Sequence, residues 1–157
     1  MADARAVRIG IISDTHGMLR PEIASVFRNV DHILHAGDVG DAEILRKLSE
    51  IAPTTAVRGN TDFAPGCANL PLFEMLSIGT AEIYMHHGHS DELDIVPVGT
   101  NVVVTGHTHV PLIRWRDDVL FINPGSAGPR RFRLPVSVAL LTILSRARSA
   151  QIVELRV

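Results

Sequence analysis

The first 60 residues of the chain alternate between short apolar runs and amphipathic stretches. The apolar runs are rich in β-branched residues and carry almost no charge, which is typical of strands buried on both faces. The amphipathic stretches repeat apolar side chains at helical spacing, and Asp41 is placed to cap the second of them. Strands and helices that alternate with short connections predict a parallel sheet. The expected strands are residues 7–13, 33–36 and 54–57, and the expected helices are residues 21–30 and 42–51.

After Pro71 the pattern changes to strands alone. Two apolar runs flank Gly79-Thr80 and predict a hairpin, and glycine, proline or Asp117-Asp118 separates the runs that follow. No repeat, linker or low-complexity tract divides the chain, so we expect one domain, residues 1–157, of the α/β class, with two facing mixed β-sheets flanked by α-helices. The strands expected here are residues 72–78, 82–86, 102–104, 112–115, 119–122, 136–144 and 152–157.

Composition and charge narrow the class of protein. The chain has 157 residues, 46% hydrophobic and 20% charged, which is ordinary for one globular domain. Its net charge of −2 argues against strong nucleic-acid binding. There is no apolar run of about 18 residues, so we expect no membrane association. The single cysteine, Cys67, and an N-terminus without a signal-peptide pattern favour a cytoplasmic protein.

Polar side chains follow directly after each of the first three predicted strands. The carboxyl ends of parallel strands meet at one edge of a sheet, so we expect these side chains to lie close together. Side chains two residues apart in an extended segment point to the same side, as Asp14 and His16 would. His107 and His109 repeat that spacing, and His87 adds one more imidazole. The residues at the strand ends are Asp14, His16, Asp38 and Asn60.

Together these positions offer seven nitrogen or oxygen ligands and no thiolate. One tetrahedral zinc site needs only four ligands, and structural zinc usually recruits cysteine. Seven ligands therefore predict two ions, as in two-metal hydrolases. Mixed imidazole and carboxylate ligation favours a transition metal over Ca²⁺ or Mg²⁺. We expect two divalent ions; the ligand types do not choose among Mn²⁺, Ni²⁺, Zn²⁺, Fe²⁺ and Co²⁺, and of these we expect Mn²⁺ first.

The ligands stand in short motifs whose order carries a family resemblance. The motifs resemble the signature of calcineurin-like metallophosphoesterases over about residues 8–144. Asn123-Pro124-Gly125-Ser126 and the compact length narrow the resemblance to the small bacterial and archaeal phosphodiesterase branch, which is related to the vacuolar-sorting subunit of retromer. The motifs are Asp14-Thr15-His16, Gly37-Asp38, Gly59-Asn60-Thr61-Asp62, His87-Gly88-His89 and Gly106-His107-Thr108-His109.

The resemblance implies a β-sandwich flanked by helices and a role for each ligand. It implies that Asp38 bridges two ions and that a hydroxide between them attacks the phosphorus. Bound metal makes such a hydroxide available near neutral pH. By the same resemblance, Asp14, His16 and His109 hold one ion, and Asn60, His87 and His107 hold the other.

Two further motif residues, His89 and Asp62, and the ligand Asn60 are expected to support catalysis. Relatives with a strong general acid carry histidine where this chain has Thr61, which cannot protonate a leaving group near pH 7. We therefore expect faster turnover of aryl than of alkyl diesters, unless His89 supplies the proton. Asp62 is expected to orient the loop of Asn60, and Asn60 to contact the substrate as well as a metal.

The remaining candidates are weaker signals. Arg130, nearest the Asn-Pro-Gly-Ser turn, is expected to contact substrate phosphate through its planar guanidinium. Aromatic residues make up only 4% of the chain, so we expect an open pocket without a stacking platform. His35 is a candidate for a position behind the ligands.

The sequence thus predicts a metal-dependent phosphodiesterase acting on small or activated phosphodiesters. Two alternatives stay open: a protein-binding scaffold on the same fold, and a nuclease or nucleotide pyrophosphatase. Intact ligands favour the enzyme, since a scaffold does not need all seven. Exposed edge strands are compatible with a homo-oligomer.

Overall fold

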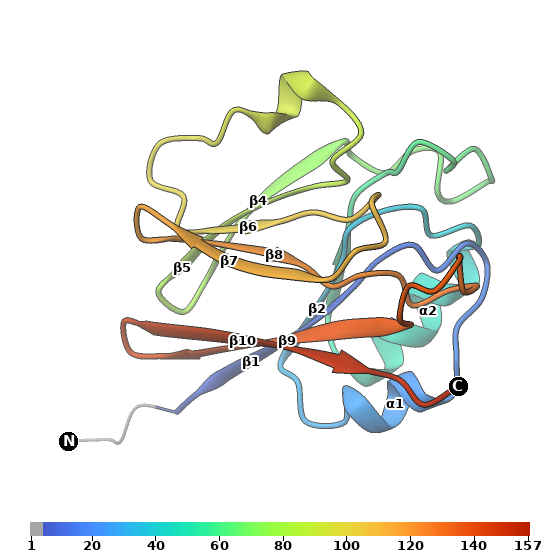
Figure 1. The fold of residues 1–157 in the computed structure, drawn as a ribbon, viewed down its shortest axis with the longest axis horizontal. Helices are drawn as coiled ribbons and strands as arrows, with labels where there is room; N and C mark the ends of the chain where they lie inside the picture. Colours follow the sequence, from blue (N-terminus) through green and yellow to red (C-terminus); the bar gives the residue numbers. More distant parts are fainter. Residues whose placement is uncertain (1–4) are drawn as a thin grey trace.

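The computed structural model describes residues 5–157, so residues 1–4 of the expected domain lie outside it. Two five-stranded sheets form a sandwich (Figure 1). The first sheet has the order β10 (Ala147–Glu154), β9 (Ser137–Leu144), β1 (Val7–Ile12), β2 (His32–His35) and β3 (Thr54–Ala56). The second has the order β4 (Phe73–Ile78), β5 (Ala81–His86), β6 (Val102–Val104), β8 (Val119–Asn123) and β7 (Leu112–Arg116).

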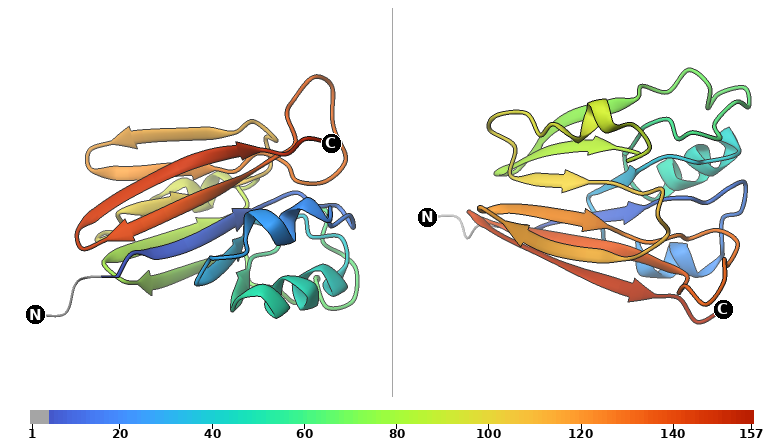
Figure 2. Two further views of the ribbon diagram at one scale, coloured as in Figure 1. Left: turned by 90° about the horizontal axis from the view of Figure 1, so that it is seen from below. Right: turned by 45° about the horizontal axis from the view of Figure 1, so that its top comes forward.

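Both sheets are mixed. Strands β1, β2 and β3 are parallel, while β9 and β10 continue that sheet in antiparallel pairing. In the second sheet, β5, β6 and β8 are parallel, and β4 and β7 are antiparallel edge strands. Helices α1 (Glu22–Val26) and α2 (Ala42–Ile51) pack on the outer face of the first sheet (Figure 2). The predicted class, two facing mixed sheets flanked by helices, is confirmed.

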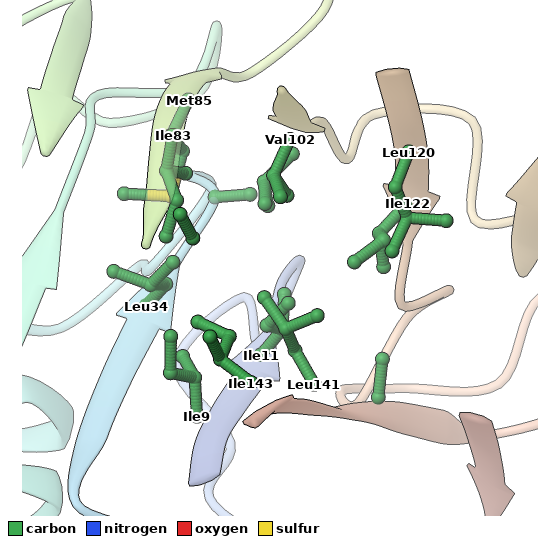
Figure 3. Close-up of a cluster of buried hydrophobic side chains, with 14 of the residues drawn as sticks. Ile9, Ile11, Leu34, Ile83, Met85, Val102, Leu120, Ile122, Leu141 and Ile143 are labelled. Carbon is green, nitrogen blue, oxygen red and sulfur yellow. The ribbon is translucent and has the colours of Figure 1, made fainter. Parts of the chain in front are cut away.

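Strand β1 is buried on both faces because a different layer covers each. Ile9 and Ile11 point between the sheets, into one buried cluster with Met85 and Ile122 of the second sheet (Figure 3). Ile12 points the other way, into the cluster beneath the helices. Alternate side chains of a strand face opposite sides, so an uninterrupted apolar run is what a central strand needs.

Three elements differ from the prediction. Helix α1 ends at Val26, four residues early, because the chain turns so that the Asp31 N–H can donate to the Arg8 carbonyl 2.7 Å away. Strand β10 spans Ala147–Glu154 instead of residues 152–157: it is an edge strand with alternating exposure, so its first half carries no apolar run. A short 3₁₀ helix, η1 (Asp91–Asp94), was not predicted. Among residues 5–157, no helix is long and apolar enough to cross a membrane.

The topology brings the ligand-bearing loops to one end of the sandwich. The carboxyl ends of β1, β2 and β3 lie side by side, and backbone bonds join their loops. The Asp14 N–H donates to the Gly37 carbonyl at 3.0 Å, and the His16 N–H donates to the Asp38 carbonyl at 2.9 Å. The Gly106 N–H donates to the His87 carbonyl at 3.0 Å, which joins two loops of the second sheet in the same way.

Candidate metal centre

Two groups of metal-ligating side chains face one another at this end of the sandwich. Within each group the ligand atoms lie within 4.8 Å of one another. We call them the buried group and the rim group. The buried group is Asp14, His16 and His109, and the rim group is Asp38, His87 and His107.

The buried group is built around the carboxylate of Asp14, which is inaccessible to solvent. Its Oδ2 atom accepts hydrogen bonds from the Ser13 hydroxyl at 2.6 Å and from the His107 backbone N–H at 3.0 Å. Burial alone would raise the pKa of Asp14, but His109, His16 and Ser13 outweigh it and hold that pKa far below its usual range. Asp14 is therefore an anion, with its second oxygen free to bind.

Two of the buried group's facing atoms lack hydrogen-bond partners within residues 5–157. Asp14 Oδ1 lies 3.3 Å from His109 Nε2 and 3.7 Å from His16 Nε2. Neither Asp14 Oδ1 nor His16 Nε2 has a hydrogen-bond partner in that part of the chain. Buried polar atoms are normally paired, so these converging atoms fit a cation held between them.

Asp38 belongs to the rim group but also faces the buried group. Its Oδ1 atom accepts a hydrogen bond from the Thr61 N–H at 2.9 Å. Its Oδ2 atom lies 3.3 Å from His87 Nε2 in the rim group and 3.7 Å from His16 Nε2 in the buried group. Burial raises the pKa of Asp38, but His87 and the Thr61 N–H outweigh it and lower that pKa to about 2.

The His87 ring is fixed in one orientation by the carbonyl of Ala36. His87 Nδ1 lies 2.7 Å from that carbonyl oxygen, so Nδ1 carries a proton and donates it. Nε2 then faces Asn60 Oδ1 at 3.0 Å and Asp38 Oδ2 at 3.3 Å. Burial lowers the pKa of His87, but Asp38 and Asp14 more than offset this and raise it. The site attracts positive charge at this point, as a metal site should.

Asn60 completes the rim group from the loop after β3. Its Oδ1 atom lies 3.2 Å from His107 Nδ1, so it faces both histidines of the rim group. Asn60 and His107 are both exposed, whereas His87 is fully buried. The structure thus brings all seven predicted ligands together: three in the buried group, three in the rim group, and Asn60 beside the latter.

The backbone that presents these ligands is left-handed at five of the seven positions, with φ between 47° and 72°. The expectation that Asp14 and His16 share a side because their segment is extended is therefore wrong. Tight turns aim the side chains instead, and such strained conformations concentrate at functional sites. The turns also need glycine: a Cβ on Gly59 would lie 2.1 Å from Asp38 Oδ1. The left-handed ligands are Asp14, His16, Asp38, His107 and His109.

With this geometry in view, similarity to known proteins identifies the family. The model of the calcineurin-like phosphoesterase superfamily domain matches residues 7–146. The chain belongs to this superfamily. A probable metallophosphoesterase of Methanocaldococcus jannaschii is 40% identical over 132 residues, which cover 75% of this chain and 67% of the relative. A phosphodiesterase of the same organism is 30% identical over 140 residues, 76% of this chain and 83% of that protein.

The fold is shared more widely than the sequence. Vacuolar protein sorting 29 from Cryptosporidium parvum superposes with a TM-score of 0.80 at 21% identity, over 96% of this chain and 92% of that one. At this identity the likeness concerns the fold alone. The superfamily is metal-dependent, and the two groups offer this phosphoesterase its ligands.

A layer of buried side chains ties the ligand loops together from behind. The Asp62 carboxylate accepts from the Gly40 N–H at 3.0 Å and from the Gly59 N–H at 2.8 Å, so it joins the loop of Asp38 to the loop of Asn60. This is the orienting position expected of Asp62, and Asp62 itself belongs to neither metal group.

His35 and Thr15 join the other pair of loops. The Gly37 N–H donates to His35 Nδ1 at 3.2 Å, so the ring proton lies on Nε2 and points to Thr15 Oγ1 at 3.0 Å. Thr15 in turn donates to the Val39 carbonyl at 2.8 Å. Sequence reasoning missed Thr15, although its place between Asp14 and His16 in the motif was a signal.

The other predicted residues lie farther out. The His89 ring centroid is 5.4 Å from that of His87 and 6.3 Å from that of His107, which places His89 beside the rim group. Thr61 is exposed. Arg130 is exposed and belongs to neither metal group.

Proposed function

We propose that the protein is a phosphodiesterase that uses two divalent metal ions, Mn²⁺ first among the candidates, to hydrolyse small or activated phosphodiesters. The observation that carries the proposal is the position of Asp38, whose Oδ2 atom faces His16 on one side and His87 on the other. A carboxylate shared by two sets of ligands is what a dinuclear site needs.

Each ion has its own ligands in this proposal, and Asp38 serves both. When bound, the ions would lower the pKa of water and offset the charge of the phosphate. Only two carboxylates stand among seven ligands, so the loaded site carries net positive charge toward an anionic substrate. The ion of the buried group would take Asp14, His16 and His109, and the ion of the rim group would take Asn60, His87 and His107.

The chain's own residues would orient the substrate. Asn60 is exposed, so its amide can reach a phosphate oxygen as well as the rim ligands. Asp62, by holding the loop of Asn60, fixes the direction of that amide. His89 lies beside the rim group, and we assign it the substrate side of the site. Arg130 is assigned to phosphate on the strength of its place in the chain.

The experiment is hydrolysis of bis(p-nitrophenyl) phosphate by chelator-stripped protein, with Mn²⁺, Ni²⁺, Zn²⁺ or Mg²⁺ restored singly. The matched control is Asp38→Asn, which keeps the shape of the side chain but removes the shared charge. We expect turnover to return with a transition metal and to fall more than about 100-fold in the variant, since even residues behind metal ligands contribute 10- to 100-fold.

Absence of turnover with every metal, in folded protein that binds the metal, would contradict the proposal. The protein-binding scaffold would then be the better hypothesis, and exposed apolar side chains such as Phe63, Ile95 and Val98 would be its contact candidates. A pull-down that recovers a stoichiometric partner would support it. Hydrolysis of nucleic acid or of a nucleotide pyrophosphate at higher rates would favour the second alternative.

A further inference from the structure

The loop between β8 and β9 is fastened to the ligand loops. The Ser126 hydroxyl donates to the Asp14 carbonyl at 3.0 Å, and the Ala127 N–H donates to the Ser13 carbonyl at 3.0 Å. A Cβ on Gly128 would lie 2.5 Å from the Asp14 carbonyl oxygen, so the two backbones are in direct contact. The base of this loop is therefore part of the wall around the buried group.

The tip of the same loop is basic and aromatic. Within residues 5–157, the side chains of Arg130, Arg131 and Arg133 form no ion pair, and all three are exposed. The sequence from Val119 to Val153 contains no Asp or Glu that could neutralise them. Arg20 adds a fourth guanidinium at the base, where it donates to the Gly128 carbonyl at 3.0 Å.

Phe132 is placed where folding alone gives no reason for it. Its side chain is 92% exposed, and its φ of 54° lies in the left-handed region that bulky residues avoid. An exposed ring gains nothing from burial that would offset this strain. A ring held out among cations is suited to stacking on a flat aromatic group of an anionic ligand.

The loop tip is within reach of the metal centre. Gly128 touches the loop of Asp14, and two residues of chain span about 7 Å at most, so Arg130 begins close to the site. Strands β1 and β9 pair antiparallel, which puts the start of β9 and the end of β1 at the same end of the sheet. In Figure 1 this loop lies at the right, with the loop after β1.

We propose that Arg130, Arg131, Phe132 and Arg133 form an outer substrate subsite that takes a nucleotidyl group, with the arginines on an additional phosphate and Phe132 on the face of the base. The proposal rests on the proposed phosphodiesterase activity and names its substrate class. It also revises the expectation that the pocket has no stacking platform. Although aromatic residues make up only 4% of the chain, one of them, Phe132, lies at the tip of this loop.

The test keeps the leaving group constant. Three p-nitrophenyl diesters are compared: bis(p-nitrophenyl) phosphate, thymidine 5′-(p-nitrophenyl phosphate), and the same thymidine ester with a 3′-phosphate. We expect kcat/KM to rise about fivefold or more with the base, the range of base–aromatic stacking, and again about two- to fivefold with the phosphate. The rise should lie mainly in KM.

Variants assign each gain to its side chain. Phe132→Ala should remove the gain from the base, and Arg130→Gln, Arg131→Gln or Arg133→Gln should reduce the gain from the 3′-phosphate, each as a ratio to the simple diester. Arg146→Gln is the matched control, an exposed arginine in the β9–β10 turn at the opposite end of the sheet. Equal kcat/KM for all three substrates, or an equal loss in Arg146→Gln, would overturn the proposal.

A binding measurement tests the proposed subsite independently of the proposed phosphodiesterase activity. If the protein hydrolyses none of the three diesters, calorimetric titration with thymidine 3′,5′-bisphosphate still reports on the loop. Binding that weakens in the loop variants and persists in Arg146→Gln would support the subsite even though the proposed function had failed. Absence of binding by the metal-loaded protein would overturn the subsite.

Discussion

Asp14 and Asp38 are the two carboxylates of the centre, and their surroundings differ. Asp14 is fully buried and receives two hydrogen bonds on one oxygen, from Ser13 and from the His107 backbone. Asp38 receives one, from the backbone of Thr61, which lies on an exposed loop. The buried group is thus defined by the protein interior, whereas the rim group shares its ligands with solvent through Asn60 and His107.

The difference implies a division of labour. If each group holds an ion, as proposed, the buried group should hold its ion more tightly, because a lower local dielectric strengthens the attraction between an anionic ligand and a cation. The rim group has exposed ligands and a neutral amide in place of a second carboxylate, so its ion should exchange more readily. The same exposure leaves the rim group open to substrate.

Substitution of the two histidines on either side of Thr108 should change metal affinity the most. It therefore tests the difference between the buried group and the rim group directly. His109 is 3% exposed and belongs to the buried group, while His107 is exposed and belongs to the rim group. We expect His109→Ala to lower the affinity for the tight ion more than about 100-fold, and His107→Ala to weaken only the other ion, about tenfold. Calorimetric titration of stripped protein with Mn²⁺ measures both.

Excess metal provides the second readout of that pair. Millimolar Mn²⁺ should restore phosphodiesterase activity to His107→Ala and not to His109→Ala. His32→Ala serves as the control, because His32 bonds to Thr55 away from the centre. If both variants lost the same metal affinity, or if the same Mn²⁺ concentration restored their activity, the two groups would not differ in how tightly they hold metal.

The rim group should also limit which leaving groups the enzyme expels. Thr61 lies on the rim loop and cannot donate a proton near neutral pH, and general acids contribute roughly 10²- to 10⁴-fold. We expect the acceleration over uncatalysed hydrolysis to be about 100-fold larger for aryl than for alkyl diesters. Thr61→His should narrow that gap, and Thr61→Val should not.

Equal acceleration of aryl and alkyl diesters in the original protein would point to another acid. His89 is the nearest candidate, since its ring lies 6.3 Å from that of His107. His89→Gln would then reduce alkyl turnover selectively. If that variant slowed aryl and alkyl substrates alike, His89 would be orienting the substrate instead of supplying a proton.

His35, which lies behind the metal ligands, should make the stability of the folded protein sensitive to acid. Burial lowers the pKa of His35 to about 4, because a charged imidazole would lose its contact with water there, and this outweighs the nearby carboxylates that favour the proton. The unfolded chain binds a proton at this histidine near pH 6.5 and the folded chain does not, so stability should fall as the pH drops from 6.5 to 4. The loss is about 3 kcal/mol.

Denaturant unfolding at several pH values measures that loss. In His35→Gln, which cannot titrate, the free energy of unfolding should change less between pH 6.5 and 4 than in the original protein. The control for general acid effects is His32→Gln, whose ring is only partly buried. Parallel pH profiles for the His35→Gln variant and the original protein would contradict the assignment.

Local patterns predicted most of the sandwich, and their failures have physical causes. The helix capped by Asp41 begins and ends where its period and cap required, since the Asp41 side chain accepts from the Glu43 N–H. Strand β10 was misplaced because an edge strand is polar on its outer face, so its first half resembles a loop. Apolar runs therefore locate central strands well but underestimate the length of edge strands.

The ligands were predictable because their chemistry is visible in the motifs, whereas the way they are aimed was not. Positive φ at Asp14 or His107 depends on backbone bonds between loops distant in sequence, which no local pattern encodes. The same holds for Thr15 and His35, whose pairing spans 20 residues. Phe132 resembled any loop phenylalanine until the exposure of its ring was known.

Substitution of Asp62 should have the smallest effect on metal affinity, because Asp62 acts on the rim group only through the loop of Asn60. Its two oxygens each accept one backbone N–H, from Gly40 and from Gly59. In Asp62→Asn one oxygen becomes an NH₂ that cannot accept, so the loop of Asn60 should loosen. We expect the affinity for the exchangeable ion to fall about tenfold, with the tight ion little changed.

Asp41→Asn is the matched control, since Asp41 caps α2 away from the centre and asparagine caps a helix equally well. Its two metal affinities should equal those of the original protein. If Asp62→Asn instead weakened both ions equally, the two groups would share one supporting layer. The distinction between a buried site and an exchangeable one would then reflect exposure of the ligands alone, not the loops that hold them.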